Sequence, residues 1–435
     1  MKKIWDPIEK HSPTALADIN ASLLKRQIEY VRAYSSFYKK KIRFQRQRVR
    51  FGLKYLQEIP FTDKQDILND QLENPPLGSN LCISMGKVFR IHRTSGTTTR
   101  PLLLAYSQKD IEHTIECGAR SFWAAGLRPR DMVVHCLNYC MWAGGITDHQ
   151  SLEQTGAAVV PYGVGNSFEL IQIIKNLEPT AIHCTPSYLA NLEIIIRQEF
   201  KMEPKELGIS LGLFGGEAGL QNPDFRQRIE YTWGFRAMDA NYGVSDVLSI
   251  FGAECEVRDG LHFMGQKVIY PELKELQSDE IIPWERGARG ELILTNLCKE
   301  CQPLLRFRSH DIIQVIDAGP CKCGRRSFRF RVIGRTDDMF VVKGINVFIS
   351  SIAAVLNKHL DEITGEFRVI VDKRDPIQQC IFRIEKKEGS AKDGLEQRIT
   401  SDLAKVLNIR PVVEIVAEAS LPRTEGKIKR LERIL

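Results

Sequence analysis

Apolar residues recur at two spacings along the chain, and each spacing predicts a different kind of element. Between residues 14 and 48 the apolar positions follow a helical spacing with basic residues between them, which predicts a long N-terminal helix. Further along, short and almost purely apolar runs alternate with stretches of helical spacing. These runs lie at residues 131–136, 157–162, 181–184 and 211–214. The alternation is typical of an α/β fold in which helices cover both faces of a mostly parallel sheet.

The pattern changes after residue 246, where short strands and turns replace the alternation of strands and helices. Residues 290–295 and 304–308 are expected strands in this part of the chain. From residue 339 onward, strands and two stretches of helical spacing predict a separate, small α+β domain. Residues 334–338, Gly-Arg-Thr-Asp-Asp, form the expected boundary between the two parts.

Polar turns follow the expected parallel strands. They lie at residues 138–145, 185–187, 215–217 and 241–246. In open parallel sheets the ligand binds beyond the carboxyl ends of the strands. We therefore expect these turns to converge on a single cleft.

A hydroxyl-rich loop at residues 93–101, Arg-Thr-Ser-Gly-Thr-Thr-Thr-Arg-Pro, lies between two apolar runs and should face the same cleft. Backbone N–H groups, several hydroxyls and the cation of Arg100 are groups that wrap a polyphosphate. A threonine-rich surface hairpin explains the loop alone equally well. The loop lacks the spacing of glycine, lysine and hydroxyl residues that defines a P-loop, so an ordinary P-loop NTPase is excluded.

Composition and charge narrow the class of protein further. The net charge of +7 is spread over 435 residues without a Lys/Arg block, which argues against nucleic-acid binding. The N-terminus lacks the apolar segment of a signal peptide, and no stretch approaches about 18 apolar residues. We expect a cytoplasmic protein that does not enter a membrane, whose 11 cysteines are thiols or metal ligands.

Three further segments carry groups that suit a nucleotide, although each alone is compatible with plain structure or a surface ion pair. In residues 241–246, an aromatic ring could stack on a base and a carboxylate could hold Mg²⁺. Asp311, in Arg-Phe-Arg-Ser-His-Asp, could accept both ribose hydroxyls. Lys427 lies in a turn close to the C-terminus, where a lone lysine is usually only solvated.

Taken in order, these segments resemble the adenylate-forming acyl-CoA synthetase superfamily, and most closely its phenylacetate–CoA ligase family, which includes coenzyme F390 synthetase-like proteins. The resemblance extends from about residue 25 to the end of the chain. It rests on five segments, at residues 89–98, 214–217, 334–339, 344–348 and 421–427.

The resemblance implies a large adenylate-forming domain and a small mobile C-terminal α+β domain. We expect a helical region over residues 1–80, an AMP-binding core over 81–335 and the mobile domain over 336–435. The expected activity is an acid–thiol ligase, in which ATP activates a carboxylic acid, such as an aromatic one, to an acyl-adenylate. CoA then takes the acyl group, and AMP and pyrophosphate are released.

The same resemblance implies roles for individual residues. Lys427 would be the catalytic cation, Asp246 would hold Mg²⁺, Asp337 would be the hinge, and Gly344 and Asn346 would line the CoA tunnel. The residues expected to bind ATP are Thr94, Ser95, Gly96, Thr97, Thr98, Arg100, Gly216, Glu217, Asn241, Tyr242, Gly243, Asp311 and Arg335. The acyl pocket would be lined by Tyr139, Met141, Trp142 and Gly144.

Two departures from the family pattern bear on activity. Where the family reads Gly-Lys-Pro after the hydroxyl-rich loop, this chain has Thr99, Arg100 and Pro101. Where the family has Glu, this chain has the shorter Asp246. Other functions therefore stay open: transfer of the acyl group or AMP to a carrier protein, an amine or an F420-like cofactor, or a non-catalytic nucleotide-binding protein. A homodimer is the expected assembly.

Four residues suggest a separate metal site. Cys255 and His262 lie seven residues apart, and Cys321 and Cys323 form a Cys-x-Cys turn before the boundary. Three thiolates and one imidazole are a typical ligand set for a closed, structural Zn²⁺ site. Unpaired thiols are the alternative.

Overall fold

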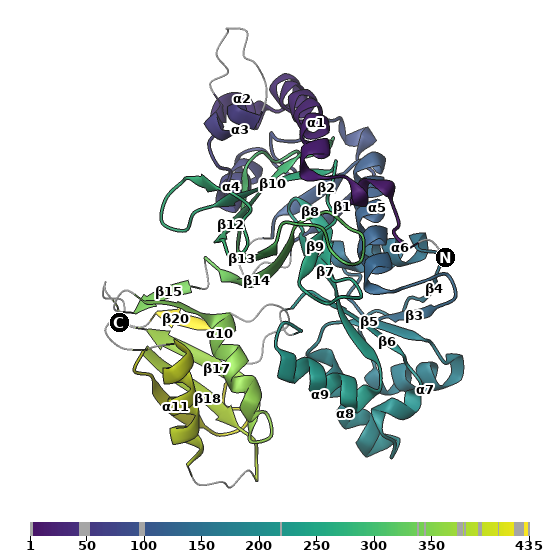
Figure 1. The fold of residues 1–435 in the computed structure, drawn as a ribbon, viewed down its shortest axis with the longest axis vertical. Coiled ribbons are helices and arrows are strands. Elements are labelled where there is room, and N and C mark those ends of the chain that lie inside the picture. Colours follow the sequence, from purple (N-terminus) through teal and green to yellow (C-terminus); the bar gives the residue numbers. More distant parts are fainter. Residues whose placement is uncertain are drawn as a thin grey trace.

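The computed structural model describes residues 3–42, 53–94, 101–217, 220–336, 339–342, 345–371, 377, 380–389, 394–407, 409–421 and 430–433. Figure 1 shows a large N-terminal part, in purple to green, and a smaller C-terminal part, in light green to yellow. The predicted α/β fold with a separate small C-terminal domain is confirmed. None of the helices in the described ranges is both long and apolar enough to cross a bilayer.

The N-terminal segment is helical, but the single helix expected over residues 14–48 ends at Tyr34. A second helix begins at once, because the Ser35 hydroxyl accepts a hydrogen bond from the Tyr38 amide at 3.1 Å and caps it. Residues 43–48 of that expectation lie outside the described residues. The elements of this segment are η1 Pro7–Lys10, α1 Pro13–Tyr34, α2 Ser36–Lys41, α3 Leu53–Glu58, α4 Lys64–Glu73 and η2 Met85–Lys87.

The predicted alternation of helices and strands forms the parallel half of the main sheet. Its strands are β3 Met132–His135, β4 Ala158–Val160, β5 Ala181–Cys184, β6 Leu211–Gly215 and β7 Arg236–Val244. They pair in parallel in the order β4-β3-β5-β6-β7. Their helices are α5 Gln108–Ala125, α6 Ala143–Gln154, α7 Ser167–Leu177, α8 Tyr188–Glu199, η3 Pro204–Leu207 and α9 Pro223–Trp233. The strands are apolar because helices cover them, as in the buried cluster around Ile182, Phe214 and Trp233.

After β7 the strands of the same sheet pair antiparallel, so parallel pairing covers only the first half of the sheet. The connections here are too short for crossover helices, which parallel strands need. Over the described residues the twelve-stranded sheet has the order β11-β10-β12-β13-β14-β9-β8-β7-β6-β5-β3-β4. The added strands are β8 Leu248–Ala253, β9 Leu261–Phe263, β10 Ile269–Lys274, β11 Ile281–Ile282, β12 Arg289–Asn296, β13 Phe307–Asp317 and β14 Arg329–Arg335.

A separate hairpin carries the hydroxyl-rich loop. It consists of β1 Arg90–Arg93 and β2 Leu103–Tyr106, which pair antiparallel with Arg93 opposite Leu103. At its open end the Leu102 amide donates to Thr94 Oγ1 at 3.2 Å, and the Thr94 amide donates to the Leu102 carbonyl at 3.0 Å. These bonds fix the two ends of the loop where the main sheet's cleft begins.

The C-terminal part has its own sheet and its own core. Strands β15 Met339–Val342 and β16 Ile345–Phe348 form a hairpin, and within the described residues the other strands have the order β19-β18-β17-β20. The remaining elements are α10 Ile349–Leu356, η4 Asn357–His359, β17 Ile363–Val371, β18 Cys380–Lys386, α11 Leu395–Leu407, β19 Val412–Val416 and β20 Leu431–Arg433. Residues such as Phe340, Phe367 and Phe382 fill this core, whose buried members, among the described residues, all come from residue 340 onward.

Candidate active site

A cavity of about 640 Å³ lies at the carboxyl ends of β6 and β7, where the sequence predicts a cleft. Its wall combines segments from the main sheet, helix α4 and the start of helix α6. The expected site residues that line it are Thr94, Trp142, Gly144, Gly216, Glu217, Asn241, Tyr242, Gly243, Asp246, Asp311 and Arg335. The fold therefore brings together residues that were expected to bind the nucleotide, the Mg²⁺ ion and the acyl group.

Asp311 is held by two donors in this cavity. The Tyr242 hydroxyl donates to Asp311 Oδ2 at 2.8 Å, and Arg335 Nη1 donates to Oδ1 at 2.6 Å. The register of β13 and β14 places Asp311 directly opposite Arg335. Burial, and secondarily the Asp311 charge, raises the pKa of Tyr242 well above its ordinary value, so its hydroxyl stays a donor.

Asp246 follows β7 in the turn to β8, and its carboxylate faces a lysine from another part of the chain. Lys64, at the start of α4, places its ammonium nitrogen 3.6 Å from Asp246 Oδ1. That oxygen is buried and has no hydrogen-bond partner. Lys299 Nζ donates to the backbone carbonyl of Asp246 at 3.2 Å. A buried carboxylate oxygen without a hydrogen bond, at the edge of a cavity, suits a cation.

The carboxyl ends of β5 and β6 are joined through Glu217. The Ser187 hydroxyl, after β5, donates to Glu217 Oε1 at 2.9 Å. Gly216, just before it, has φ of 79°, which a side chain would strain. This turn therefore presents backbone rather than side chain to the cavity at Gly216.

Asn241 is tied to a carboxylate that the sequence did not single out. Its amide nitrogen donates to Asp148 Oδ2, and Asp148 is fully buried on helix α6. Burial raises the pKa of Asp148 well above its ordinary value. The two residues lie far apart in the sequence, so no local pattern could link them. The bond fixes α6, which carries the acyl segment, against the end of β7.

The expected acyl segment is divided between the cavity and its surroundings. Trp142 and Gly144 line the cavity, and a Cβ added at Gly144 would lie 2.9–3.1 Å from three atoms of the Trp142 ring. The Tyr139 hydroxyl instead makes a 3.0 Å contact with His149 Nδ1, and the Met141 side chain is exposed. The Arg93 amide donates to the Met141 carbonyl at 2.8 Å, which joins this segment to strand β1.

Several expected residues lie outside the described residues. These are Ser95, Gly96, Thr97, Thr98, Arg100, Asp337, Gly344 and Lys427. Asn346 lies in β16 opposite Val341, and its side chain is not described. Their roles stay predictions.

Cys255, His262, Cys321 and Cys323 come together in the structure, all buried, with their ligand atoms within 4.8 Å of one another. Cys255 Sγ lies 3.8 Å from Cys321 Sγ, and Cys323 Sγ lies 3.6 Å from His262 Nε2. His262 Nδ1 contacts the Ser327 hydroxyl at 3.2 Å, which leaves Nε2 facing the thiols. The tetrad is a donor set of the kind that binds Zn²⁺. Cys298 and Cys301 do not join it.

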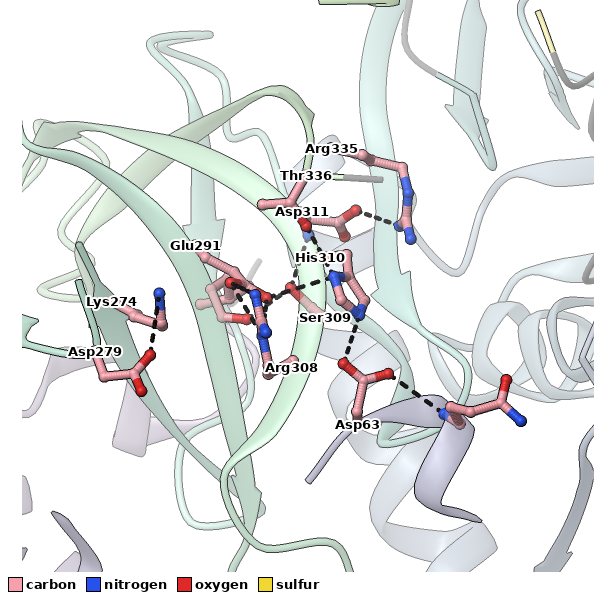
Figure 2. Close-up of polar contacts among 12 residues, drawn as sticks. Asp63, Lys274, Asp279, Glu291, Arg308, Ser309, His310, Asp311, Arg335 and Thr336 are labelled. Atoms are coloured by element: carbon pink, nitrogen blue, oxygen red, sulfur yellow. Dashed lines mark hydrogen bonds and ion pairs between the residues drawn. The ribbon is translucent and has the colours of Figure 1, made fainter. Parts of the chain in front are cut away.

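The cavity wall also contains residues that were not expected from the sequence, among them Asp63, Lys64 and His310. Asp63 caps helix α4, where its side chain accepts a hydrogen bond from the Gln65 amide. His310 Nε2 lies 3.1 Å from Asp63 Oδ2, and its Nδ1 lies 2.8 Å from Thr336 Oγ1 (Figure 2). A cap motif signals Asp63, but the contact between these distant segments has no sequence signal.

The chain is similar in sequence to several enzymes of known activity. Residues 344–432 match the family model described as AMP-binding enzyme C-terminal domain. A phenylacetate-coenzyme A ligase of Escherichia coli (strain K12) is 31% identical over 438 residues, which cover 98% of this chain and 96% of that protein. A second, from Thermus thermophilus, is 28% identical and covers 87% of each chain.

The chain is also similar to solved structures of a 2-hydroxyisobutyryl-CoA ligase. In the postadenylation state with 2-HIB-AMP, that enzyme matches with a TM-score of 0.87 at 27% identity, over 100% of this chain and 93% of its own. In the thioesterification state with 2-HIB-AMP and CoA, the TM-score is 0.73 at 27% identity, over 99% and 92%.

Proposed function

Because the chain belongs to the phenylacetate–coenzyme A ligase family of adenylate-forming enzymes, we propose that it activates a small carboxylic acid with ATP and passes the acyl group to CoA. In the first step a carboxylate oxygen attacks the α-phosphorus of ATP, and pyrophosphate leaves. In the second, the CoA sulfur attacks the carbonyl carbon of the acyl-adenylate, the thiol proton is lost and AMP leaves. An aromatic acid is the class that the family suggests first.

The observation that supports this proposal most directly is the pair of hydrogen bonds that hold Asp311. A carboxylate whose two oxygens accept from Tyr242 and Arg335 is rigid and negatively charged, so it can accept the two ribose hydroxyls in one fixed geometry. The same cavity contains Gly216 and Glu217, beside which the adenine would lie. Binding the nucleoside at a fixed point places the α-phosphate in front of the acyl pocket, which is how positioning lowers the barrier.

The charge on the phosphates would be met by groups on three segments. Asp246 and its buried Oδ1 would hold Mg²⁺, which when bound supplies neutralisation of the phosphate charge. Lys64, now 3.6 Å from that oxygen, lies where it can turn to the phosphates. The loop at residues 94–100 would wrap the phosphates, and Lys427 would stabilise the transition state electrostatically.

The agreement with the two states of the 2-hydroxyisobutyryl-CoA ligase supports two catalytic arrangements. The TM-score of 0.87 to the postadenylation state exceeds that of 0.73 to the thioesterification state, so the described arrangement corresponds to the first. We place the boundary of the mobile domain at residue 336 and the hinge at Asp337. Rotation there would bring the loop containing Gly344 and Asn346 to the CoA tunnel.

Zn²⁺ fits the tetrad as a structural ion. The ligands, three thiols and one imidazole, are buried and converge, and the Ser327 contact sets the orientation of the His262 ring. The nearby Arg325 pairs with Glu9 at 2.6 Å, so the site would join the N-terminal segment to β9 and the Cys321–Cys323 turn. Its proposed role is stability and not chemistry.

Consumption of free CoA tests the proposed acceptor. Protein, ATP, Mg²⁺ and CoA are incubated with a panel of aromatic and aliphatic acids, and acyl-CoA is measured by mass spectrometry. Formation of a thioester with a particular acid supports the ligase. Acid-dependent AMP formation without any thioester would instead favour a carrier protein or an amine as the acceptor.

A further inference from the structure

His310 occupies an unusual backbone position directly before Asp311. Its φ is 62°, in the left-handed region that few residues other than glycine adopt, although Asn, Asp and His are enriched among them. The pairing of β13 with β12 jumps here from Arg308 to Ile312, which marks a local irregularity of the sheet. A non-glycine residue kept in this conformation indicates that the surrounding contacts impose it.

The ring of His310 joins two segments that are far apart in the sequence. On one side Nε2 contacts Asp63 Oδ2 at 3.1 Å, at the beginning of helix α4. On the other side Nδ1 contacts Thr336 Oγ1 at 2.8 Å, and the Thr336 amide donates to the His310 carbonyl at 2.7 Å. Figure 2 shows the ring between these two partners, with Asp311 turned towards Arg335.

Charged side chains on β12 and β13 lie beside this ring. Glu291, on β12, lies 3.7 Å from Nδ1, and Arg308, on the same strand as His310, holds Glu291 through two nitrogens at 3.0 and 2.8 Å. The ring contacts Asp63 and Thr336 at shorter distances, 3.1 and 2.8 Å, than it does Glu291. The Asp63 carboxylate is itself fixed as the cap of α4.

Thr336 links this bridge to the ribose site and to the hinge. It follows Arg335, whose guanidinium donates to Asp311, and it precedes Asp337, the proposed hinge. We propose that His310 is a positioning residue. By linking Thr336 to Asp63 at the start of helix α4, its ring holds Arg335 against Asp311 and so orients the carboxylate that would bind the ribose. This inference rests on the proposed function, because it assumes that a nucleotide occupies the cavity.

Loss of the His310 contacts should weaken recognition of the ribose hydroxyls and of no other part of the nucleotide. Equilibrium binding of ATP and of 2′,3′-dideoxy-ATP, with Mg²⁺ and without acid, is measured by calorimetry. The unaltered protein should prefer ATP. In His310→Gly, which removes the ring and relieves the backbone, the preference should fall about tenfold, the usual effect of weakening a hydrogen bond to a charged group. The affinity for the dideoxy nucleotide should stay unchanged.

Two variants separate the contacts of the ring. His310→Asn tolerates a positive φ and places an amide near the position of Nδ1, so it should keep the Thr336 contact and most of the preference. Thr336→Val removes only the hydroxyl and should reproduce the loss seen in His310→Gly. His359→Asn is the matched control, because His359 also contacts an aspartate, Asp402, at 3.1 Å but lies in the C-terminal domain. It should bind both nucleotides as the unaltered protein does.

Each outcome decides the matter. Equal weakening of ATP and dideoxy-ATP, or an unchanged preference in either His310→Gly or Thr336→Val, would overturn the role of His310. If His310→Gly does not fold, Thr336→Val alone decides it by the same ratio. Absence of any preference for ATP in the unaltered protein would contradict the proposed nucleotide site itself, which distinguishes that failure from a failure of this inference.

Discussion

Arg335 Nη1 lies 2.6 Å from Asp311 Oδ1, and the two residues face each other across the β13–β14 pair. The pair is formed by neighbouring strands that meet at the cavity, and the Tyr242 hydroxyl occupies the second carboxylate oxygen. These two hydrogen bonds orient the Asp311 carboxylate, for which we propose a role in ribose binding, in the absence of a nucleotide. This geometry makes the nucleotide half of the reaction the part that is most directly open to test.

Asp311→Asn should weaken ATP binding by about tenfold to a hundredfold, because a neutral amide cannot accept two ribose hydroxyls and the Arg335 bond together. The secondary structure by circular dichroism should not change, since Asn has nearly the same size. Titration with ATP measures the effect. ATP affinity equal to that of the unaltered protein would contradict the placement of the ribose at Asp311.

Trp142→Ala should shift the acid preference toward bulkier acids. The Trp142 ring fills the space beside Gly144, so its removal enlarges the acyl side of the cavity. The KM for ATP should change little, because the Asp311 site is left intact. Acyl-CoA formation across a series of acids of increasing size gives the profile. A profile identical to that of the unaltered protein would show that Trp142 does not limit the acid.

Protein purified without chelator should contain about one Zn²⁺ per chain, because the tetrad supplies the four ligands of one tetrahedral ion. Cys323→Ser should lose most of the metal and lower the melting temperature. Cys380→Ser, at another buried thiol outside the tetrad, should retain the metal. Elemental analysis and thermal unfolding provide the two readouts, and well-folded protein without zinc would refute the site.

Asp63→Asn should change the acid dependence of stability. The pKa of Asp63 lies at about 2, below the ordinary value of 3.8, chiefly because of its hydrogen bond with His310. Because folding lowers the pKa of this carboxyl group, its ionised form stabilises the fold at pH values above 3.8. This contribution disappears as the pH falls from 3.8 toward 2. Asn still caps α4 but cannot titrate. The variant should therefore be less stable at neutral pH and lose less stability across that window.

Urea unfolding at neutral pH and at several acidic values tests this expectation. Asp18→Asn, at an exposed position of α1, is the control and should follow the unaltered protein. A difference between Asp63→Asn and the unaltered protein that stays constant from neutral pH down through the window would contradict the predicted coupling to His310.

The sequence predicted those elements whose apolar spacing is local, and it missed contacts between distant segments. The strands at residues 181–184 and 211–214 are predictable because helices cover them and, apart from His183, their positions are apolar or glycine. The helix predicted over residues 14–48 is too long, because apolar spacing does not show that Ser35 caps a second helix. The bond from Asn241 to Asp148 and the bridge from Asp63 to Thr336 depend on topology, so no single stretch of sequence signals them.

The family motifs led to eleven residues that line one cavity among the described residues, and their roles there stay predictions. Before the resemblance, the sequence offered Asp311 only as a candidate beside the alternative of a surface ion pair, which is common, and it did not single out Arg335. Tyr139 shows the limit of the motif. Its position in the sequence predicts an acyl-pocket residue, yet its hydroxyl contacts His149 outside the cavity wall.

The central claim is that this chain adenylates a carboxylic acid, and pyrophosphate release tests it most directly. Release is measured with ATP, Mg²⁺ and a panel of aromatic and aliphatic acids, for the unaltered protein and for Lys427→Ala. We predict that pyrophosphate release depends on a particular acid. Lys427→Ala should abolish this release while ATP still binds, because the lysine acts on the transition state. If protein that binds ATP released no pyrophosphate with any of the acids, this result would contradict the account.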